Sequence, residues 1–328
     1  MDQPKLPYCY GDSTVFSDNL TVREALAQAG LDWTVTKKPL FYREETPTLV
    51  NFNYCPGIIA VVREDSGTVM GGVGDNYAPI QNLEAFSVVD EVVEQGLARI
   101  TAAGSLKGGR IVWMYLDVGE SVEVFEGDEI APRLVLVKSH DSSSSFRAIP
   151  MAVRMQCTNV VPSLIRSGKM QYLSIRHSGN THIKLEQAEK AIEFTYAAFQ
   201  NYVEAMKRFT ERPVHPNELL HYQAMLFPPT ETKTGLQVTP QTQSKRNTFK
   251  DLWNRVGTPD DPNSMSPALA GTAYAAYQCA TYYANHSQPV ASTEVDHQSM
   301  RWNRMLTSAP THTLLGDSFE FFLEEEDA

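Results

Sequence analysis

The stretch Ala98-Arg-Ile-Thr-Ala-Ala-Gly-Ser-Leu-Lys107-Gly-Gly-Arg110-Ile-Val-Trp-Met-Tyr-Leu-Asp117 predicts two β-strands. Residues 98–103 and 110–117 are rich in apolar and β-branched side chains, and Lys107-Gly108-Gly109 between them has the composition of a turn. Further runs with strand-like content follow at 122–125, 133–139 and 146–156, each separated from the last by a short polar or glycine-containing segment. The sequence therefore predicts an antiparallel meander.

The segments before the meander predict a helix and a hairpin. Within residues 80–96 the apolar residues recur every three or four positions, which places them on one face of a helix that we expect to lie on the sheet. Residues 57–63 and 68–73 form a probable hairpin around the turn 64–67. A short helix is expected from Thr21 to Gly30, because a glycine ends it.

The pattern becomes helical from Thr181 onward. Apolar residues define one stripe over about eight turns as far as Pro213, which predicts a long helix, and shorter helical patterns follow it. We therefore expect an α+β fold with an antiparallel, β-rich amino-terminal half and an α-helical carboxyl-terminal half. The expected domains are residues 1–180, carrying a basic surface, and residues 181–328, ending in an acidic tail.

Composition and cysteine usage are those of an ordinary globular chain. The 328 residues are 42% hydrophobic and 20% charged, and no apolar run reaches the ~18 residues of a membrane span. The four cysteines lie far apart without a Cys-x-x-Cys pair, which is typical of reduced thiols. We expect a cytoplasmic location and no association with a membrane.

Basic residues are concentrated between Ala131 and Leu185, which contain eight Lys or Arg residues and one acidic residue, Asp141. This window has a formal charge of +7 in a chain of net charge -11, so the rest of the chain carries -18. Such a separation indicates a polyanionic partner, and we expect single-stranded DNA. The alternative is a solvated sheet, because Arg133 and Lys138 are five residues apart and point to opposite faces of a strand.

The candidate nucleic-acid-binding residues are cations that would hold phosphates and aromatic rings on which bases would stack. Trp113 and Tyr115 have the same parity on one predicted strand, although most aromatic residues at such positions belong to a core. The cations are Lys107, Arg110, Lys138, Arg147, Arg154, Arg166, Lys169 and Arg176, and the rings are those of Trp113, Tyr115 and Tyr172.

No catalytic signature accompanies these residues. The glycine-bearing turns match neither a P-loop nor a dinucleotide-binding motif, and the sequence has no recognisable Ser-His-Asp or His-Glu-x-x-His pattern. The histidines and cysteines of the basic window lack the close pairing of a zinc site. We therefore expect no enzymatic activity, cofactor or metal. An open alternative is a metal-dependent nuclease, in which His140, Asp141 and His177 would be the metal ligands.

The carboxyl terminus has six acidic and no basic residues among its last twelve, interleaved with aromatic residues. An acidic end of this kind is often a solubilising tail. The alternative is a docking peptide for a protein partner.

Several separate blocks of the sequence, in order, carry a specific resemblance. They are Gly30-Leu31-Asp32-Trp33-Thr-Val, Gly72-Val-Gly74-Asp75-Asn-Tyr77-Ala-Pro79-Ile-Gln81-Asn82, Ala103-Gly104-Ser105-Leu-Lys-Gly108-Gly109-Arg110-Ile-Val-Trp113, Ser139-His140-Asp141-Ser-Ser, Val153-Arg154-Met-Gln-Cys157-Thr-Asn159 and Gly271-Thr272-Ala273-Tyr274. Over most of residues 30–290 the chain resembles the phage/plasmid-like proteins of the domain-of-unknown-function family 932. It departs from the family pattern at Ser142, Thr158 and Val160.

This resemblance implies a role in the replication or recombination of a phage or plasmid. The layout is also similar in outline to phage single-strand annealing proteins of the Red-beta, RecT and Erf kind, a likeness of fold alone, and such proteins form rings or filaments without a cofactor. The leading hypothesis is therefore a non-enzymatic, homo-oligomeric protein that binds single-stranded nucleic acid. The alternative is a protein-binding phage or plasmid accessory or counter-defence factor.

Overall fold

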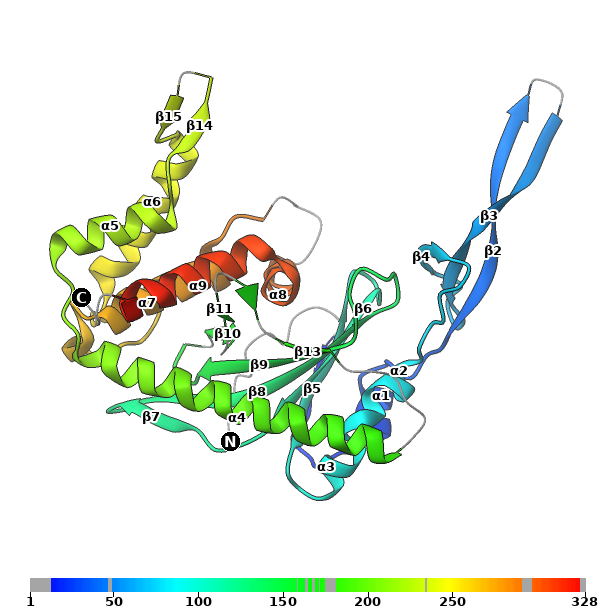
Figure 1. Cartoon of the computed structure of the whole chain (residues 1–328), viewed down its shortest axis with the longest axis horizontal. Helices are drawn as coiled ribbons and strands as arrows, with labels where there is room; N and C mark the ends of the chain where they lie inside the picture. The colour runs from blue at the N-terminus through cyan, green and yellow to red at the C-terminus, as the bar shows by residue number, and fades with distance from the viewer. Residues whose placement is uncertain are drawn as a thin grey trace.

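The computed structural model describes residues 13–46, 49–157, 159–162, 165–166, 169–170, 172–174, 181–233, 235–290 and 297–324. It confirms the α+β class, with antiparallel sheets in the amino-terminal half and helices in the carboxyl-terminal half (Figure 1). None of the helices in these ranges is both long enough and apolar enough to cross a membrane.

The predicted meander forms the central antiparallel sheet, with strand order β1-β5-β6-β8-β9-β10. Pro150 lies inside β9, opposite Leu134 of β8 in a continuous register. Its missing N–H is tolerated because the strands on the other side of β9 do not pair with it: β10 pairs with residues 151–153 and β13 with residues 147–148. The strands are β1 (Ser13–Val15), β5 (Arg99–Leu106), β6 (Ile111–Asp117), β7 (Val122–Phe125), β8 (Asp128–Ser139), β9 (Arg147–Arg154), β10 (Val160–Pro162) and β13 (Leu173–Ser174), with a separate two-stranded pair β11 (Ile165–Arg166) and β12 (Lys169–Met170).

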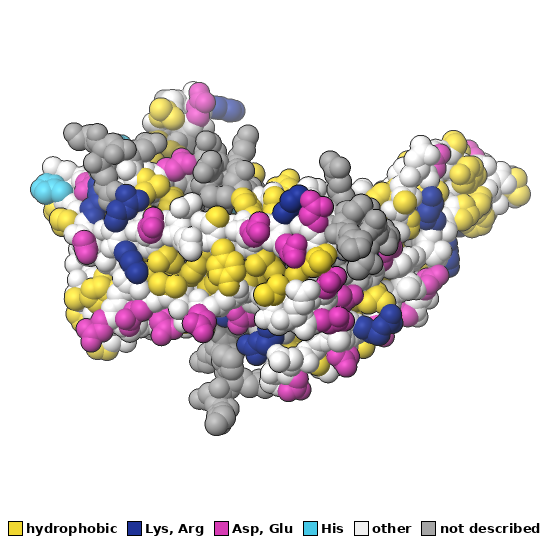
Figure 2. All heavy atoms as spheres, turned by 60° about the horizontal axis from the view of Figure 1, so that its bottom comes forward, with side chains coloured by type: hydrophobic (Ala, Val, Ile, Leu, Met, Phe, Trp, Pro, Cys, Tyr) yellow, Lys and Arg dark blue, Asp and Glu magenta, His cyan; other side chains and the backbone are white. Residues whose placement is uncertain are grey.

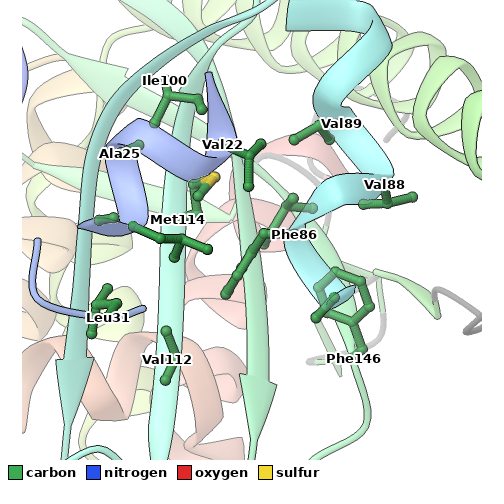
Figure 3. Packing of buried hydrophobic residues seen from close by; sticks show 14 of the residues in the cluster. Val22, Ala25, Leu31, Phe86, Val88, Val89, Ile100, Val112, Met114 and Phe146 are labelled. Carbon is green, nitrogen blue, oxygen red and sulfur yellow. The ribbon is translucent and has the colours of Figure 1, made fainter. Parts of the chain in front are cut away.

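One face of the central sheet is covered by short helices from the amino-terminal half. Along β6, Val112 and Met114 point to this side and pack with Val22, Leu31 and Phe86 (Figure 3). Thr21 caps the first helix through a reciprocal capping box with Glu24. The helices are α1 (Val22–Gln28), α2 (Asn82–Phe86), the 3₁₀ helix η1 (Ser87–Val89) and α3 (Asp90–Glu94), so the single helix expected over 80–96 is instead three short turns.

The long helix predicted from Thr181 is α4 (Thr181–Glu211), which crosses the molecule (Figure 1). Ala188 and Ala191 belong to the same hydrophobic cluster as the sheet residues Leu134 and Leu136. The sheet and this helix therefore share a core. The division into domains at residue 180 stays a prediction.

The remaining helices pack around α4 and over the second face of the sheet. Trp302, Met305 and Leu315 join Trp113 and Tyr115 in one buried cluster. The helices are α5 (Pro216–Leu226), α6 (Pro240–Arg255), the 3₁₀ helix η2 (Pro267–Leu269), α7 (Ala273–Tyr282), the π-helical turn η3 (Tyr283–Ser287), α8 (His297–Thr307) and α9 (Ala309–Glu324), with a small hairpin of β14 (Thr230–Thr232) and β15 (Gly235–Gln237).

The acidic end of the chain is largely a packed helix. Phe322 of α9 is fully buried, and its ring contacts those of Phe209 and Tyr222. The aromatic residues of the expected docking peptide are therefore core residues, and residues 325–328 lie outside the described part.

A second sheet projects from the body as a long arm (Figure 1). It consists of β2 (Val35–Thr46), β3 (Leu49–Arg63) and β4 (Val69–Gly74) in the order β2-β3-β4. The hairpin predicted around 64–67 forms its base as β3 and β4. Beyond the base, residues 41–46 and 49–54 pair only with each other. We call this two-stranded part the β2–β3 arm.

Candidate functional site

Two of the candidate cations lie at the surface. Lys107 and Arg110 are exposed on the turn between β5 and β6, where Lys107 and both glycines have positive φ. The backbone N–H of His140 donates to the carbonyl of Arg110 at 2.8 Å, which ties the turn to the end of β8. These two residues are placed as a phosphate contact would require.

Lys138 and Arg154 are buried, which corrects their expected role as phosphate contacts. Lys138 lies in β8, between β6 and β9, with 3% of its surface exposed. Arg154 ends β9 and is 2% exposed, and its guanidinium forms an ion pair with Asp128 at 2.6 Å. Neither side chain can reach an anion in solvent.

Trp113 and Tyr115 are also buried, which corrects their expected role as stacking surfaces for bases. Their shared parity is confirmed, but the face that they share is covered by α8. The indole of Trp302 packs edge-on against Trp113, with centroids 5.7 Å apart, and lies 6.4 Å from the ring of Tyr115. Both are core residues, so no base can stack on them.

Arg147 and Tyr172 are the candidate residues that the structure brings into contact with each other. The guanidinium of Arg147 lies over the exposed Tyr172 ring, 4.9 Å from its centroid, and donates to the hydroxyl of Ser144 at 2.6 Å. The opposite-face prediction is also confirmed, because Arg133 pairs with Asp117 on the side of the sheet away from Lys138. The side chains of Arg166 and Lys169, and all of Arg176, lie outside the described residues.

The buried Lys138 belongs to a polar cluster beneath α2. Its ammonium group donates to the carbonyl of Ile80 and to Oδ1 of Asn82. Nε2 of His140 also contacts Oδ1 of Asn82 at 2.8 Å, and the Asn82 amide donates to the carbonyl of Leu31. The blocks around Leu31, Asn82 and His140, which lie far apart in the sequence, therefore meet here.

The protonation of this cluster is set by burial. Burial lowers the pKa of Lys138 to about 7, because it disfavours the charged form more strongly than the Glu84 carboxylate favours it. Burial and the nearby Lys138 charge lower the pKa of His140 to about 3, so its imidazole is neutral. No described group of three His, Cys, Asp or Glu residues is close enough to hold a metal ion. His177 lies outside the described residues.

A second polar cluster joins the sheet to the helices. Asp128 receives the Arg154 guanidinium and also the hydroxyl of Tyr274 at 3.0 Å. The amide of Asn159 donates to Asn263 at 3.0 Å and to Thr281 at 3.1 Å. Burial raises the pKa of the Cys157 thiol, so it stays neutral. Its hydrogen bonds tie residues of the sheet to residues of the helical half, while the side-chain amide nitrogen of Asn263 is buried without a partner among the described residues.

Among the described residues, a group of exposed large apolar side chains lies close together on the β2–β3 arm, which the sequence interpretation missed. Phe41 lies opposite Tyr54 and Arg43 opposite Phe52, so these four side chains share one face of the ribbon, and Val50 extends it. The Phe41 and Tyr54 rings meet edge to face with centroids 5.8 Å apart, and 69% of Phe52 is exposed.

Figure 2 shows these hydrophobic side chains at the projecting end of the molecule. On the opposite face of the arm the Asn53 amide donates to Glu44, and Tyr42 and Leu49 are exposed beside them. Three exposed rings, those of Phe41, Phe52 and Tyr54, thus share the first face, which we call the aromatic face.

A sequence signal for this face exists. Val50, Phe52 and Tyr54 alternate with asparagines, which is the period of a strand with one apolar side. A Pro-Thr turn composition at residues 47–48 separates them from the preceding run. The pattern predicts a hairpin, but it does not predict that the apolar side lacks a covering layer.

The comparisons with known proteins give one family. The model described as Domain of unknown function (DUF932) matches residues 69–306, more than half of the chain. The matched range includes both polar clusters except Leu31, and it leaves out the arm. No curated protein and no solved structure matches the chain.

Proposed function

This chain belongs to the family defined by the domain of unknown function DUF932, and we propose that it is a non-enzymatic binding protein that holds another protein chain on the aromatic face of its β2–β3 arm.

The observation that carries this proposal is the uncovered aromatic face. An isolated two-stranded ribbon is marginally stable in water, and no described residue packs on the face formed by Phe41, Phe52 and Tyr54. Its three rings are half to two-thirds exposed and so still offer roughly 350 Å² of apolar area, since a fully buried aromatic ring contributes 150–250 Å². That is a large part of the about 800 Å² that each partner gives to a standard protein interface.

The charges of the arm favour a protein over a nucleic acid. Residues 41–46 and 49–54 contain one arginine and two glutamates, and Arg43 is paired with Glu45 at 3.0 Å. The ribbon therefore has no excess of positive charge to neutralise phosphates. Elsewhere, the buried Arg154 and Arg133 already pair with carboxylates.

Single-stranded nucleic-acid binding, in the replication or recombination of a phage or plasmid, is the second candidate function. It is favoured by the exposed Lys107 and Arg110 and by the row of exposed rings on the arm, on which bases would stack. This candidate requires phosphate contacts at the turn and a steep salt dependence, with a slope of about -0.7 per phosphate contacted.

The test places a photo-crosslinking phenylalanine analogue at Phe52, inside the native host cell. We expect a crosslinked protein adduct that disappears when Phe41 and Tyr54 are also changed to Ser, because the docking face is then lost. The control replaces Leu97, which is 52% exposed on the body of the protein, and should give no adduct.

An adduct with nucleic acid in place of protein would contradict the first proposal and favour the second. A fluorescent single-stranded oligonucleotide titrated at low salt gives the matching measurement. Binding that Lys107→Ala and Arg110→Ala abolish supports the second candidate, and the absence of binding removes it.

A further inference from the structure

A groove with apolar walls and a basic rim lies between α5 and α6, on the helical side of the molecule. Its volume is about 470 Å³. Val214, Leu219 and Leu220 form one wall, and Phe249 and Trp253 form the other. Leu220 is 64% exposed, so it is accessible to a partner that enters the groove.

The charged residues that line this groove are both basic. Lys250 is exposed at the rim, and Arg246 is held nearby through hydrogen bonds to the carbonyl of Phe227. No carboxylate is among the lining residues in the described part of the chain. The groove is therefore suited to a segment that combines apolar side chains with negative charge.

The end of the β2–β3 arm has this chemistry. Its exposed Val50 lies opposite Glu45 and its exposed Phe52 lies opposite Arg43. With Glu44 included, residues 41–46 and 49–54 carry a net charge of -1. The ribbon is narrow, and both of its edges lack a neighbouring strand among the described residues. It can therefore enter a groove between two helices.

The arm and the groove lie at opposite ends of the molecule (Figure 1). The arm of a chain therefore cannot fill the groove of the same chain. We infer that the end of the β2–β3 arm of one copy docks in the α5–α6 groove of a second copy. This inference rests on the proposed function, because it names the protein chain that the arm binds.

The contact joins two different surfaces, an arm and a groove, so a pair of copies does not use up all of its binding surfaces. A pair of copies keeps one free groove at one end and one free arm at the other. Heterologous contacts of this kind continue from copy to copy and give a ring when the rotation closes, or a filament when it does not. Assembly beyond the dimer is the expected behaviour.

The test is a complementation between two variants of the full chain. Phe52→Asp disables the arm and Leu220→Asp disables the groove, and both residues are exposed, so neither change alters the core. Sedimentation at increasing concentration should show oligomers larger than dimers for the unchanged chain and at least about tenfold weaker association for each variant.

An equimolar mixture of the two variants should form dimers that grow no further. In the mixture, the intact arm of the Leu220→Asp variant binds the intact groove of the Phe52→Asp variant. The pair then has no working arm or groove left with which to add a further copy. Leu97→Asp is the matched control and should assemble like the unchanged chain. In addition, Lys250→Glu should weaken assembly, since it places an acid opposite the acidic arm.

Three results would overturn the inference: an unchanged chain that stays monomeric, a mixture that does not pair, or Leu220→Asp assembling like the unchanged chain. The first result together with an adduct at position 52 to a different protein leaves the proposed function standing. No adduct at position 52 in the cell, with a monomeric chain, overturns both.

Discussion

Lys138 and Arg154 are both buried basic residues, but they differ in the groups that their charged ends contact. Arg154 has the carboxylate of Asp128 within 2.6 Å, whereas Lys138 donates to the neutral oxygens of Ile80 and Asn82. A buried charge without an opposite charge is costly, and a lysine responds by releasing its proton at lower pH. The two residues therefore respond differently to mutation and to pH.

Lys138→Met removes the buried charge, and its effect on stability should depend on pH. Between pH 7 and about 10.5 the unfolded chain binds a proton on Lys138 that the native chain has lost, so the unchanged protein gains stability as pH rises. The stability of Lys138→Met relative to the unchanged protein should thus be highest near pH 7 and fall by up to about 1.4 kcal/mol per pH unit above it.

Denaturant unfolding at several values between pH 7 and 9.5 measures this difference. His140 is neutral over that range, because burial lowers its pKa to about 3, so it adds nothing to the slope. Parallel stability curves for the two proteins would show that Lys138 does not titrate there.

Asp128→Ala should destabilise the protein by about 3–5 kcal/mol, because it leaves the Arg154 guanidinium buried without a carboxylate. The double variant Asp128→Ala/Arg154→Met should recover part of this loss, since no unpaired charge remains inside. Urea unfolding followed by tryptophan fluorescence compares them. A double variant less stable than the single one would argue against an electrostatic cause.

At the scale of elements, the β2–β3 arm is separated from its base by a bulge. Pro39 pairs with Ile59 and Phe41 with Tyr54, so Leu40 alone stands opposite residues 55–58. Gly57 within this bulge has φ of 79°, where an L side chain is strained. The bulge therefore sets the direction in which the arm leaves the body.

Gly57→Ala should weaken the arm by about 1–2 kcal/mol, the cost of a left-handed conformation for a residue with a Cβ. Nothing lies within 4 Å of the added carbon, so conformational strain is the cause. Hydrogen exchange should become faster in residues 41–54 and stay unchanged in the base strands. Gly72→Ala is the control, since its added carbon makes an ordinary contact at 3.5 Å and its φ is not positive.

The helices were predicted with unequal success, and the misses have physical causes. The uninterrupted stripe of α4 and the proline after it were sufficient to predict its length. The helix α9 was missed because its acidic residues resemble a solvated tail, although Phe319 and Phe322 pack beside α4 and α7. The arm was missed because a strand with one apolar side is normally half-buried.

For the whole molecule, the central question is whether the sheet and the helices unfold together. Trp302 of α8 is fully buried against Trp113 of the sheet, and Ala188 of α4 lies in the core on the other face. The sheet thus has helices from the carboxyl-terminal half on both faces. We expect a single cooperative transition.

Trp302→Ala should lower the stability of the whole chain by about 3–5 kcal/mol, the usual cost of removing a large buried ring. Helix content from circular dichroism and the fluorescence of Trp33 and Trp113 should shift to the same lower denaturant concentration. A sheet signal that keeps its midpoint while the helix signal shifts would instead support independent domains divided at residue 180.

The fold class, the order of most elements and the family could be read from the amino-acid sequence alone. Hydrophobic periodicity and turn composition act over a few residues, so they report strands, helices and which side chains share a face, as with Trp113 and Tyr115. The family resemblance rested on blocks that are local in the same sense.

Which of those faces remain exposed could be seen only once the chain was folded. Lys138, Arg154, Trp113 and Tyr115 became interior because helices and carboxylates distant in the sequence pack over them. The aromatic face of the arm stayed exposed because no described element covers it. Exposure depends on contacts between residues far apart in the chain, which local charge and periodicity do not contain.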